Sequence, residues 1–556
     1  MLNLFIETVK KLEITSSTKE KTETIANALK QINIDEELLL FSRYLCGIIY
    51  PAYSPKKINL GTKLIVQAII KAYKLDKETF QEFFKGSEDI SECISKIYTQ
   101  YKSSVRKSII FSDRSIPESL KDIQILFDDI SNISSNIKKV NYIIDLIFCL
   151  PLDILLTVIK ILTNTLRVGI KEAIVEKAIS VAFNKNIQII RKAMFYTGDI
   201  GEVAVHAKNN KIESIKFKLF HPIKVMLASS EENIDEIFER MEKDIWCEYK
   251  YDGIRAHIHK EDDRVEIYTR DLKNITDQFP EIVFFLKKIE QSDFLLDGEI
   301  VPFQNNKIMQ FSLLQKRLGR KEKIDIAARE NPCTFIAYDI IYDDGKLVTD
   351  LPLHKRRALL ENKFSSSGLL FSKYKIVNTK EEFIDFFKKS KEEGREGLMI
   401  KKIDSIYESG KRGINWIKYK ETLDPLDVVI VKAEQGEGKN AKYLSQYTFA
   451  VWDEKKQNLL EIGKVYSGAT EELLEELTKK LQEYAVKELE NGYEVKPIII
   501  LEVAFENIQI SNRYNGGYAV RFPRIIRERT GDKSLDEINT IEDVKKLYLK
   551  LQKEAN

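Results

Sequence analysis

One lysine lies in a setting that could support nucleophilic chemistry. The stretch CEYKYDGIR, residues 247–255, places Lys250 two residues after Glu248 and five before Arg255. A lysine amine attacks an electrophile only when it is neutral, and nearby positive charge or desolvation lowers its pKa enough for that. The simpler interpretation is a surface turn, because Asp-Gly is a turn dipeptide and Lys and Arg favour solvent. The stretch alone does not decide between a nucleophile and a turn.

Six further short motifs follow in order along the chain. Each has a simple structural explanation when it is taken alone: a Glu-Gly turn, an exposed strand or a core tyrosine. Their joint occurrence favours a single functional site, because the simple explanations would all have to hold together. The motifs are YTRD (268–271), LLDGEI (295–300), AYDIIYDDG (337–345), REGLMIKK (395–402), WIKYK (416–420) and RFPRIIRER (521–529).

The elements that must position these motifs change in type along the chain. Up to residue 215 the apolar residues recur at helical spacing, as in Ile25, Leu29 and Ile32. Residues 216–421 alternate short strand-like runs with helical segments, and residues 422–556 read as strands with tight turns and one helix. We therefore expect a multidomain α+β protein: an all-α domain, an α/β domain and a C-terminal OB-fold β-barrel.

The most apolar stretch, residues 143–162, is long enough to raise the question of a membrane span. Asp145, Asp153 and Lys160 lie inside it and Pro151 divides it. Charges near a bilayer centre cost a few kcal/mol each. We expect two buried helices that meet at Pro151, and no membrane partner.

Composition indicates the cellular compartment but does not identify a binding partner. Hydrophobic residues make up 43% and charged residues 31%, and the net charge of +2 neither requires nor excludes nucleic acid. The five cysteines include no CxxC pair, which disfavours a zinc ribbon and a disulfide framework. The N-terminus lacks the features of a signal peptide. We expect a cytoplasmic protein, and a monomer by default.

The ordered series resembles the nucleotidyltransferase motifs of the ATP-dependent DNA ligases, and the archaeal-type replicative enzymes most. Residues 166–180, 197–208 and 221–229 also resemble that family's DNA-binding domain and its junction with the core. The resemblance implies an enzyme that seals 3′-OH/5′-phosphate nicks in duplex DNA during replication and repair. It also implies two intermediates, a covalent lysyl-AMP and a DNA-adenylate, with ATP and Mg²⁺ as cofactors; Mn²⁺ can substitute.

The resemblance also implies roles for individual residues. Lys250 is the expected nucleophile, Glu248 faces the adenine amino group and Arg255 lies near the ribose and phosphate. Tyr338 stands where the family stacks an aromatic, usually Phe, on adenine. The remaining expectations are Arg270 for the ribose or nick 5′-phosphate; Glu299 and Glu396 for the ribose and Mg²⁺; Arg412, Lys418 and Lys420 for the phosphates; and Arg521 and Arg524 for ATP.

The last motif departs from the family pattern. The family commonly closes it with Arg-x-Asp-Lys, whereas this chain has one residue more in Arg529-Thr-Gly-Asp532-Lys533. Either Asp532 and Lys533 are displaced or the loop bulges.

The resemblance also suggests where macromolecules bind. Nicked duplex DNA is the expected partner, and LRVGIKE (166–172) could hold a phosphate at a helix start. The tip formed by Ile109, Ile110 and Phe111 lies where related enzymes carry a sliding-clamp hook. An ordinary core-facing turn explains that tip equally well. The implied location is the cytoplasm, in association with the nucleoid.

Two other classes of function compete with this one. RNA ligases and cap guanylyltransferases share the lysine and the acidic motifs, but they do not normally carry about 215 helical residues ahead of the lysine. A DNA-binding scaffold that has lost catalysis would not need Lys250, Glu299, Glu396 and Lys418. An NAD-dependent ligase would be expected to bring a four-cysteine zinc module, which this sequence lacks.

Overall fold

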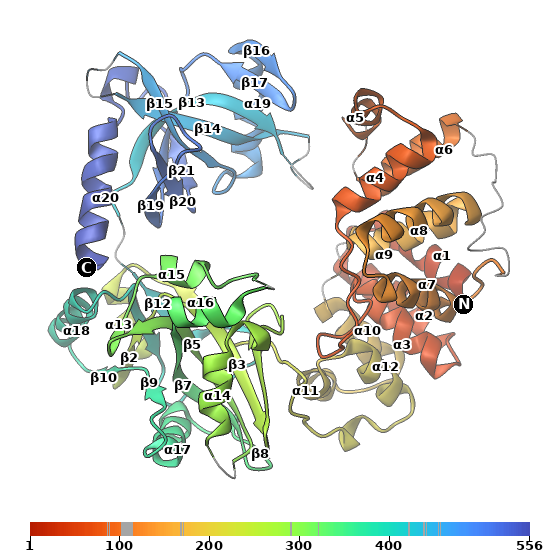
Figure 1. The fold of residues 1–556 in the computed structure, drawn as a ribbon, viewed down its shortest axis with the longest axis horizontal. Coiled ribbons are helices and arrows are strands. Elements are labelled where there is room, and N and C mark those ends of the chain that lie inside the picture. Colours follow the sequence, from red (N-terminus) through yellow and green to blue (C-terminus); the bar gives the residue numbers. More distant parts are fainter. Residues whose placement is uncertain are drawn as a thin grey trace.

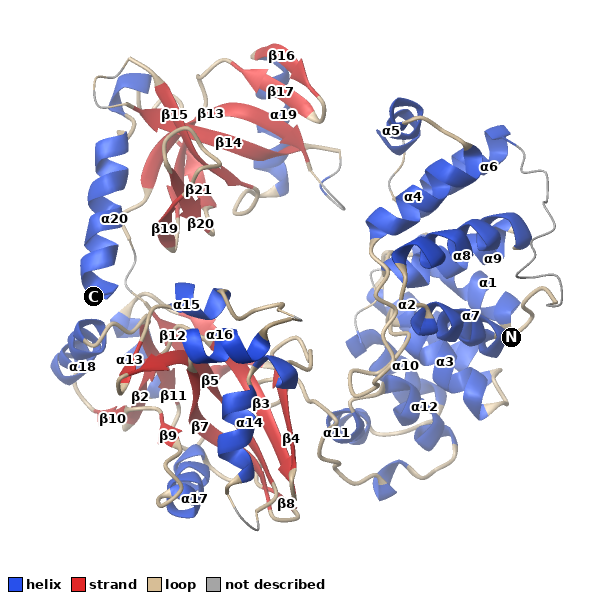
Figure 2. Ribbon diagram, viewed as in Figure 1, coloured by secondary structure: helices blue, strands red, loops and turns tan. Residues whose placement is uncertain are grey.

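The chain forms three bodies: helices on one side, a mixed α/β body, and a strand-rich body above it (Figure 1). Figure 2 separates them by secondary structure and confirms the expected fold class at this level. The structure is a computed structural model, and it describes all residues except 86, 88, 102–114, 167–169, 171, 290–291, 321, 421–422, 437–439, 441, 454, 456 and 556.

The N-terminal body is a bundle of helices around one apolar core that runs from Leu2 to Ile212. Polar caps set several helix starts: Ser17 accepts a hydrogen bond from the Glu20 amide, and Ser119 forms a capping box with Asp122. The elements are α1 (Leu2–Glu13), α2 (Thr18–Lys30), α3 (Asp35–Leu45), α4 (Thr62–Tyr73), α5 (Lys77–Lys85), α6 (Ile90–Tyr101), α7 (Leu120–Asn132), α8 (Asn136–Cys149), α9 (Leu152–Thr163), α10 (Glu172–Ala182), α11 (Ile187–Thr197), α12 (Ile200–Lys208) and the 3₁₀ turn η1 (Ile212–Ser214).

The apolar stretch 143–162 forms two helices, as expected. α8 ends at Cys149 and α9 begins at Leu152, with Pro151 at the N-cap between them, since proline starts a helix well but interrupts one. Both helices bury their apolar faces in the bundle core. Within the described residues no helix is long and apolar enough to cross a membrane.

The central body contains two sheets that are mostly antiparallel, with the parallel pairs β1–β12 and β7–β9. One sheet has the order β1-β12-β11-β2-β10, and the other β4-β3-β5-β7-β8, with β6 on β5 and β9 on β7. The elements are β1 (Leu227–Ser230), α13 (Ile234–Met241), β2 (Ile245–Lys250), β3 (Ile254–Glu261), β4 (Arg264–Thr269), η2 (Thr276–Gln278), α14 (Pro280–Lys287), β5 (Phe294–Gln304), β6 (Lys307–Ile308), α15 (Phe311–Gln315), α16 (Ile324–Glu330), β7 (Cys333–Asp343), β8 (Lys346–Leu347), α17 (Leu353–Phe364), β9 (Leu370–Phe371), β10 (Tyr374–Val377), α18 (Lys380–Glu392), β11 (Gly397–Lys401) and β12 (Arg412–Tyr419).

The C-terminal body is built around a curled antiparallel sheet with its own core, from Leu426 to Val544. A two-stranded ribbon, β19–β20, projects toward the central body (Figure 1). The elements are β13 (Leu426–Gln435), β14 (Leu444–Trp452), β15 (Leu459–Val465), α19 (Glu471–Glu483), β16 (Ala485–Leu489), β17 (Gly492–Val495), β18 (Ile500–Ala504), β19 (Asn507–Ile510), β20 (Tyr518–Arg521), β21 (Arg524–Glu528), η4 (Leu535–Glu537) and α20 (Ile541–Ala555).

Specific contacts connect the three bodies. Between the helical and central bodies, the rings of Tyr53 and His221 stack 3.8 Å apart. At the opposite end of the bundle, Gln81 on α5 donates a hydrogen bond of 2.7 Å to Glu490 in the β16–β17 turn. The domain limits 215/216 and 421/422 stay predictions, and residues 421–422 lie outside the described part of the chain.

Candidate active site

Strand pairing places Lys250 and Glu396 side by side. Lys250, the last residue of β2, pairs with Gly397 at the start of β11, and the Glu396 amide donates a 2.9 Å hydrogen bond to the Lys250 carbonyl. Side chains alternate along a strand, so Trp246, Glu248 and Lys250 share one face of β2. Two motifs 146 residues apart thus join at one end of one sheet.

The Lys250 amine forms an ion pair with the Glu396 carboxylate. Lys420 also pairs with Glu396, and it lies 3.3 Å from Glu506 of the C-terminal body. Burial alone would raise the pKa of Glu396, but the charges of Lys250 and Lys420 hold it below its ordinary value. Glu396 is therefore an ionised carboxylate shared by two lysines.

Lys418 adds a third lysine to this group. Desolvation, together with the charges of Lys420 and Lys250, lowers the pKa of Lys418 below its ordinary value. Positive charge of this kind disfavours the protonated form of any amine near it. The cluster thus concentrates positive charge around Glu396.

Glu248 lies on the same face of β2 as Lys250. It is buried, and its carboxylate accepts hydrogen bonds from Trp246 Nε1 at 2.7 Å, Lys401 Nζ at 2.8 Å and Ser372 Oγ at 3.2 Å. The Lys401 amine also lies 4.8 Å from the centre of the Tyr338 ring. Glu248 and Tyr338 therefore border one aromatic and charged niche. Lys401, Trp246 and Ser372 are members of it that sequence reasoning missed.

Arg255 is held by a buried carboxylate. Its Nε and Nη2 donate to Asp297 at 3.0 and 2.6 Å, and its Nη1 donates to the Met226 carbonyl at 2.6 Å. Tyr407 donates to the same Asp297 at 2.7 Å and accepts from the Met226 amide at 3.2 Å. Despite its burial, Asp297 has a pKa well below its usual range because Arg255 and His257 stabilise its charge. Sequence reasoning missed Asp297 and Tyr407, although Asp297 lies inside the LLDGEI motif.

Glu299 lies next to this pair on β5, opposite Arg255 in the register of β3 and β5. A Cβ on Gly253 would lie 2.7 Å from Glu299 Cγ, so the Asp-Gly turn after Lys250 packs directly on this acid. Burial raises the pKa of Glu299 to about 8, and Glu396 adds to the rise. None of the described residues donates a hydrogen bond to its carboxylate.

Glu299 and Glu396 are the two carboxylates that could hold a divalent cation. A dication there would favour the ionised form of Glu299, which the charges of Lys250 and Arg255 favour only in part against its burial. Among the described residues no three His, Cys, Asp or Glu side chains converge. Mg²⁺ is commonly held by one or two carboxylates, with water and phosphate oxygens completing its shell. Glu299 and Glu396 are thus an adequate donor set.

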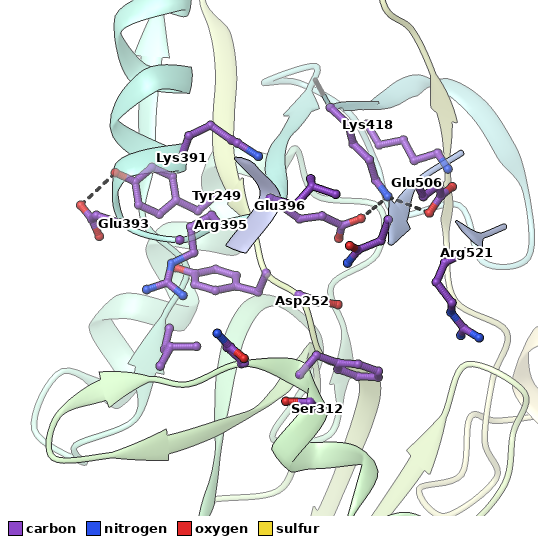
Figure 3. Close-up of a pocket in the computed structure, with 18 of the residues that line it drawn as sticks. Tyr249, Asp252, Ser312, Lys391, Glu393, Arg395, Glu396, Lys418, Glu506 and Arg521 are labelled. Atoms are coloured by element: carbon purple, nitrogen blue, oxygen red, sulfur yellow. Dashed lines mark hydrogen bonds and ion pairs between the residues drawn. The ribbon is translucent and has the colours of Figure 1, made fainter. Parts of the chain in front are cut away.

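A cavity of about 1210 Å³ opens beside this cluster, between the central and C-terminal bodies. Asp252, Glu396, Lys418 and Lys420 line it from the central body. Glu506, Arg521 and Arg524 line it from the C-terminal body, and Figure 3 shows Lys418, Glu506 and Arg521 grouped on one side. The structure therefore brings the RFPR motif to the same opening as the lysine cluster.

The structure leaves other predicted residues outside this group. Arg270 is exposed, one residue beyond the last β3–β4 pair, Ala256–Thr269, so it lies at the Arg255 end of the sheet. The side chain of Arg412 falls outside the described residues, as do Ile109, Ile110, Phe111 and parts of LRVGIKE.

The lengthened last motif forms a closed turn. The Asp532 and Lys533 amides both donate to the Arg529 carbonyl, and Gly531 supplies a φ of +99°. Lys533 pairs with Asp427 within the C-terminal body. The loop thus accommodates its extra residue, and Lys533 points toward Asp427.

Comparison with known proteins matches three segments of the chain to models of one family. Residues 225–420 match the ATP dependent DNA ligase domain, residues 1–180 the DNA ligase N terminus, and residues 440–532 the ATP dependent DNA ligase C terminal region.

Full-length relatives agree. A DNA ligase of Archaeoglobus fulgidus is 32% identical over 99% of both chains, and a probable DNA ligase of Koribacter versatilis is 33% identical over 98% of this chain and 96% of its own. The solved structure described as Pmar-Lig_PreS3 covers 94% of this chain and 99% of its own, with a TM-score of 0.59 at 16% identity, which supports the fold. The chain belongs to the ATP-dependent DNA ligases, enzymes that seal nicks through adenylate intermediates.

Proposed function

We propose that Lys250 is the residue that carries AMP. Its neutral amine attacks the α-phosphate of ATP, a P–N bond forms, the bond to pyrophosphate breaks, and the amine gives up a proton. The AMP group then passes to a DNA 5′-phosphate and Lys250 is released. Attack by the 3′-hydroxyl forms the phosphodiester bond and expels AMP.

The observation that carries this proposal is the charge cluster at the end of β2. Lys250 pairs with Glu396, and Lys418 and Lys420 lie within electrostatic range of both. Glu396 is the counter-ion of Lys250, and the neighbouring lysines add positive charge around the pair. Attack on ATP would require Lys250 to give up this ion pair and its proton.

The niche beside Lys250 suits a nucleoside. Glu248 offers a buried carboxylate to the adenine amino group, and Tyr338 offers a ring for stacking. Three of the five Arg255 N–H groups are used by Asp297 and Met226, which leaves two for the ribose and phosphate. We assign Arg270 and Arg412 to the phosphate or sugar as well, and Arg521 and Arg524 to the triphosphate.

Glu299 and Glu396 would hold Mg²⁺. When bound, the ion offsets phosphate charge during in-line displacement. The protein residues contribute position: the Gly253 turn packs on Glu299, and the β2–β11 pairing fixes Glu396 beside Lys250.

The substrate we propose is nicked duplex DNA, in replication and repair, in the cytoplasm with the nucleoid. A duplex requires phosphate contacts on several faces. Basic residues of the helical body and the cavity could supply them. Docking of Ile109, Ile110 and Phe111 on a sliding clamp stays a prediction.

A labelling experiment tests the proposal. Purified protein is incubated with Mg²⁺ and α-labelled ATP, GTP or NAD, then denatured. We expect acid-labile label from ATP, its loss in Lys250→Ala, and its retention in Lys402→Ala, which removes a nearby lysine that pairs with Glu242. Label that survives in Lys250→Ala, together with sealing of nicks, would contradict the assignment.

A further inference from the structure

Arg395 is a cation that no described residue neutralises. Its guanidinium makes no hydrogen bond or ion pair with the described residues, and its Nε is buried without an acceptor. The group lies 5.5 Å from the centre of the Tyr251 ring. Desolvation lowers its pKa from the ordinary value of arginine. Burying an unpaired charge costs free energy that a bound anion would return.

The charge of Glu393 acts on Arg395, but the hydrogen bonds of this acid go to other groups. Glu393 accepts from Lys373 Nζ at 2.7 Å and from the Tyr249 hydroxyl at 3.1 Å. Lys391 lines the same wall. Figure 3 shows Arg395, Tyr249, Lys391 and Glu393 on the side of the cavity away from Lys418 and Arg521.

This wall is separate from the niche of the nucleotide. Lys250 and Glu248 lie on one face of β2, whereas Tyr249 lies on the other and Tyr251 follows the strand. Arg395 contacts the Tyr251 side, although the next residue, Glu396, reaches Lys250. An ATP molecule held against Lys250 would leave this wall open, whereas a polynucleotide that crosses the cavity could contact both.

We infer that Arg395, flanked by Lys391, binds one backbone phosphate of the DNA substrate next to the nick. The inference rests on the proposed function, since it takes the nick to lie at Lys250. The cavity is far larger than one phosphate, and Asn306, Ser312 and Phe311 also line it, groups suited to a sugar and a base. Guanidinium groups bind phosphate through paired N–H donors.

The test compares Arg395→Gln with Arg395→Lys, which keeps the charge, and with Lys388→Gln. Lys388 is an exposed lysine of α18 that does not line the cavity. Each protein is titrated, without ATP, against a nicked duplex with a 3′-dideoxy end, over a range of salt concentrations. Arg395→Gln should reduce the slope of log K against log salt by about 0.9, the value for one lost phosphate contact. Arg395→Lys and Lys388→Gln should keep the wild-type slope.

A chemical version of the same experiment locates the phosphate. Neutral methylphosphonates replace single phosphates on either side of the nick. We expect one position to weaken wild-type binding and to have no further effect in Arg395→Gln. An unchanged slope, or equal methylphosphonate sensitivity in wild type and variant, would overturn the inference.

Two further measurements distinguish DNA phosphate from nucleotide or free phosphate, and distinguish this inference from the proposed function. Arg395→Gln should self-adenylate with the same KM for ATP as wild type. Inorganic phosphate should weaken DNA binding no more than chloride does at the same ionic strength. A raised KM for ATP would move the contact from DNA to the nucleotide and overturn the inference. Failure of wild-type protein to label at Lys250 would refute the proposed function instead, and the salt slopes would be unaffected by that failure.

Discussion

At the scale of residues, the chemistry depends on how the charge of Lys250 is removed. Glu396 holds the amine in an ion pair, and Lys420 pairs with the same carboxylate. Under the proposed function Glu396 has two partners, a lysine and a divalent cation. A residue with this double role should be far more sensitive to substitution than its acidic neighbours.

Glu396→Ala should slow self-adenylation about a hundredfold or more, which corresponds to about 3 kcal/mol of transition-state stabilisation. The fold should survive, because the side chain lies at a cavity and not in a core. Rates of AMP transfer and the melting temperature are measured together, with Glu392→Ala, an exposed acid at the end of α18, as control. A wild-type rate would remove Glu396 from the site.

Tyr407→Phe removes a hydroxyl that contacts Asp297, the carboxylate that holds Arg255. The change should therefore loosen Arg255. The phenol donates to Asp297 and accepts from the Met226 amide. Loss of a hydrogen bond to a charged group costs about 1.5–3 kcal/mol, so we expect a roughly ten- to hundredfold lower kcat/KM for ATP. The check is a double-mutant cycle with Arg255→Lys.

If Tyr407 acts through Arg255, the double variant should be little worse than Arg255→Lys alone. Additive losses, with a matching fall in melting temperature, would instead assign Tyr407 a general structural role.

At the scale of elements, the site is made by strand register. The motifs around Lys250, Glu299 and Glu396 could be recognised from sequence, because they belong to one ordered series of short motifs. The residues that hold these motifs in position could not be predicted. Lys401 and Tyr407 lie 153 and 110 residues from the carboxylates they contact, and no local pattern records such pairings. Only the folded sheets bring them together.

Gly298 shows how tightly that register is set. A Cβ there would lie 2.4 Å from the Ile336 carbonyl and 2.4 Å from the Phe335 ring on β7. Gly298→Ala should therefore push β5 from β7, destabilise the central body by about 1–3 kcal/mol and displace Glu299.

Thermal unfolding and self-adenylation check this prediction, with Gly61→Ala as control, since a Cβ at Gly61 meets nothing within 4 Å. Unchanged stability and activity in Gly298→Ala would show that the two strands tolerate a wider separation.

At the scale of the whole molecule, the three bodies and their order could be predicted from the change in hydrophobic period along the chain. Their mutual placement could not, because it depends on a few contacts such as Arg524–Glu232 and Lys420–Glu506. These two pairs are partly exposed, and exposed ion pairs are worth little. We therefore predict that the C-terminal body swings between steps.

A reversible crosslink tests the swing. A thiol–thiol linker joins Glu232→Cys to Phe522→Cys, two positions that line the cavity from opposite bodies, in a chain whose non-buried Cys46 and Cys149 are changed to Ser. The locked enzyme should self-adenylate, because Arg521 and Arg524 line the same cavity as Lys418 and Lys420.

Nick sealing by the locked enzyme should fall at least about tenfold, since the cavity stays covered, and reduction of the linker should restore it. Glu232→Cys alone controls for modification. Full sealing in the locked state would refute the swing.

The central claim is that Lys250 forms the bond to AMP. Protein incubated with ATP and Mg²⁺, without DNA, is digested under conditions that preserve the P–N bond, and the adenylylated peptide is sequenced by tandem mass spectrometry. One AMP group on Lys250, lost when nicked DNA is added, is the result we predict. AMP on another lysine, such as Lys418 or Lys420, or none on any residue, would contradict it.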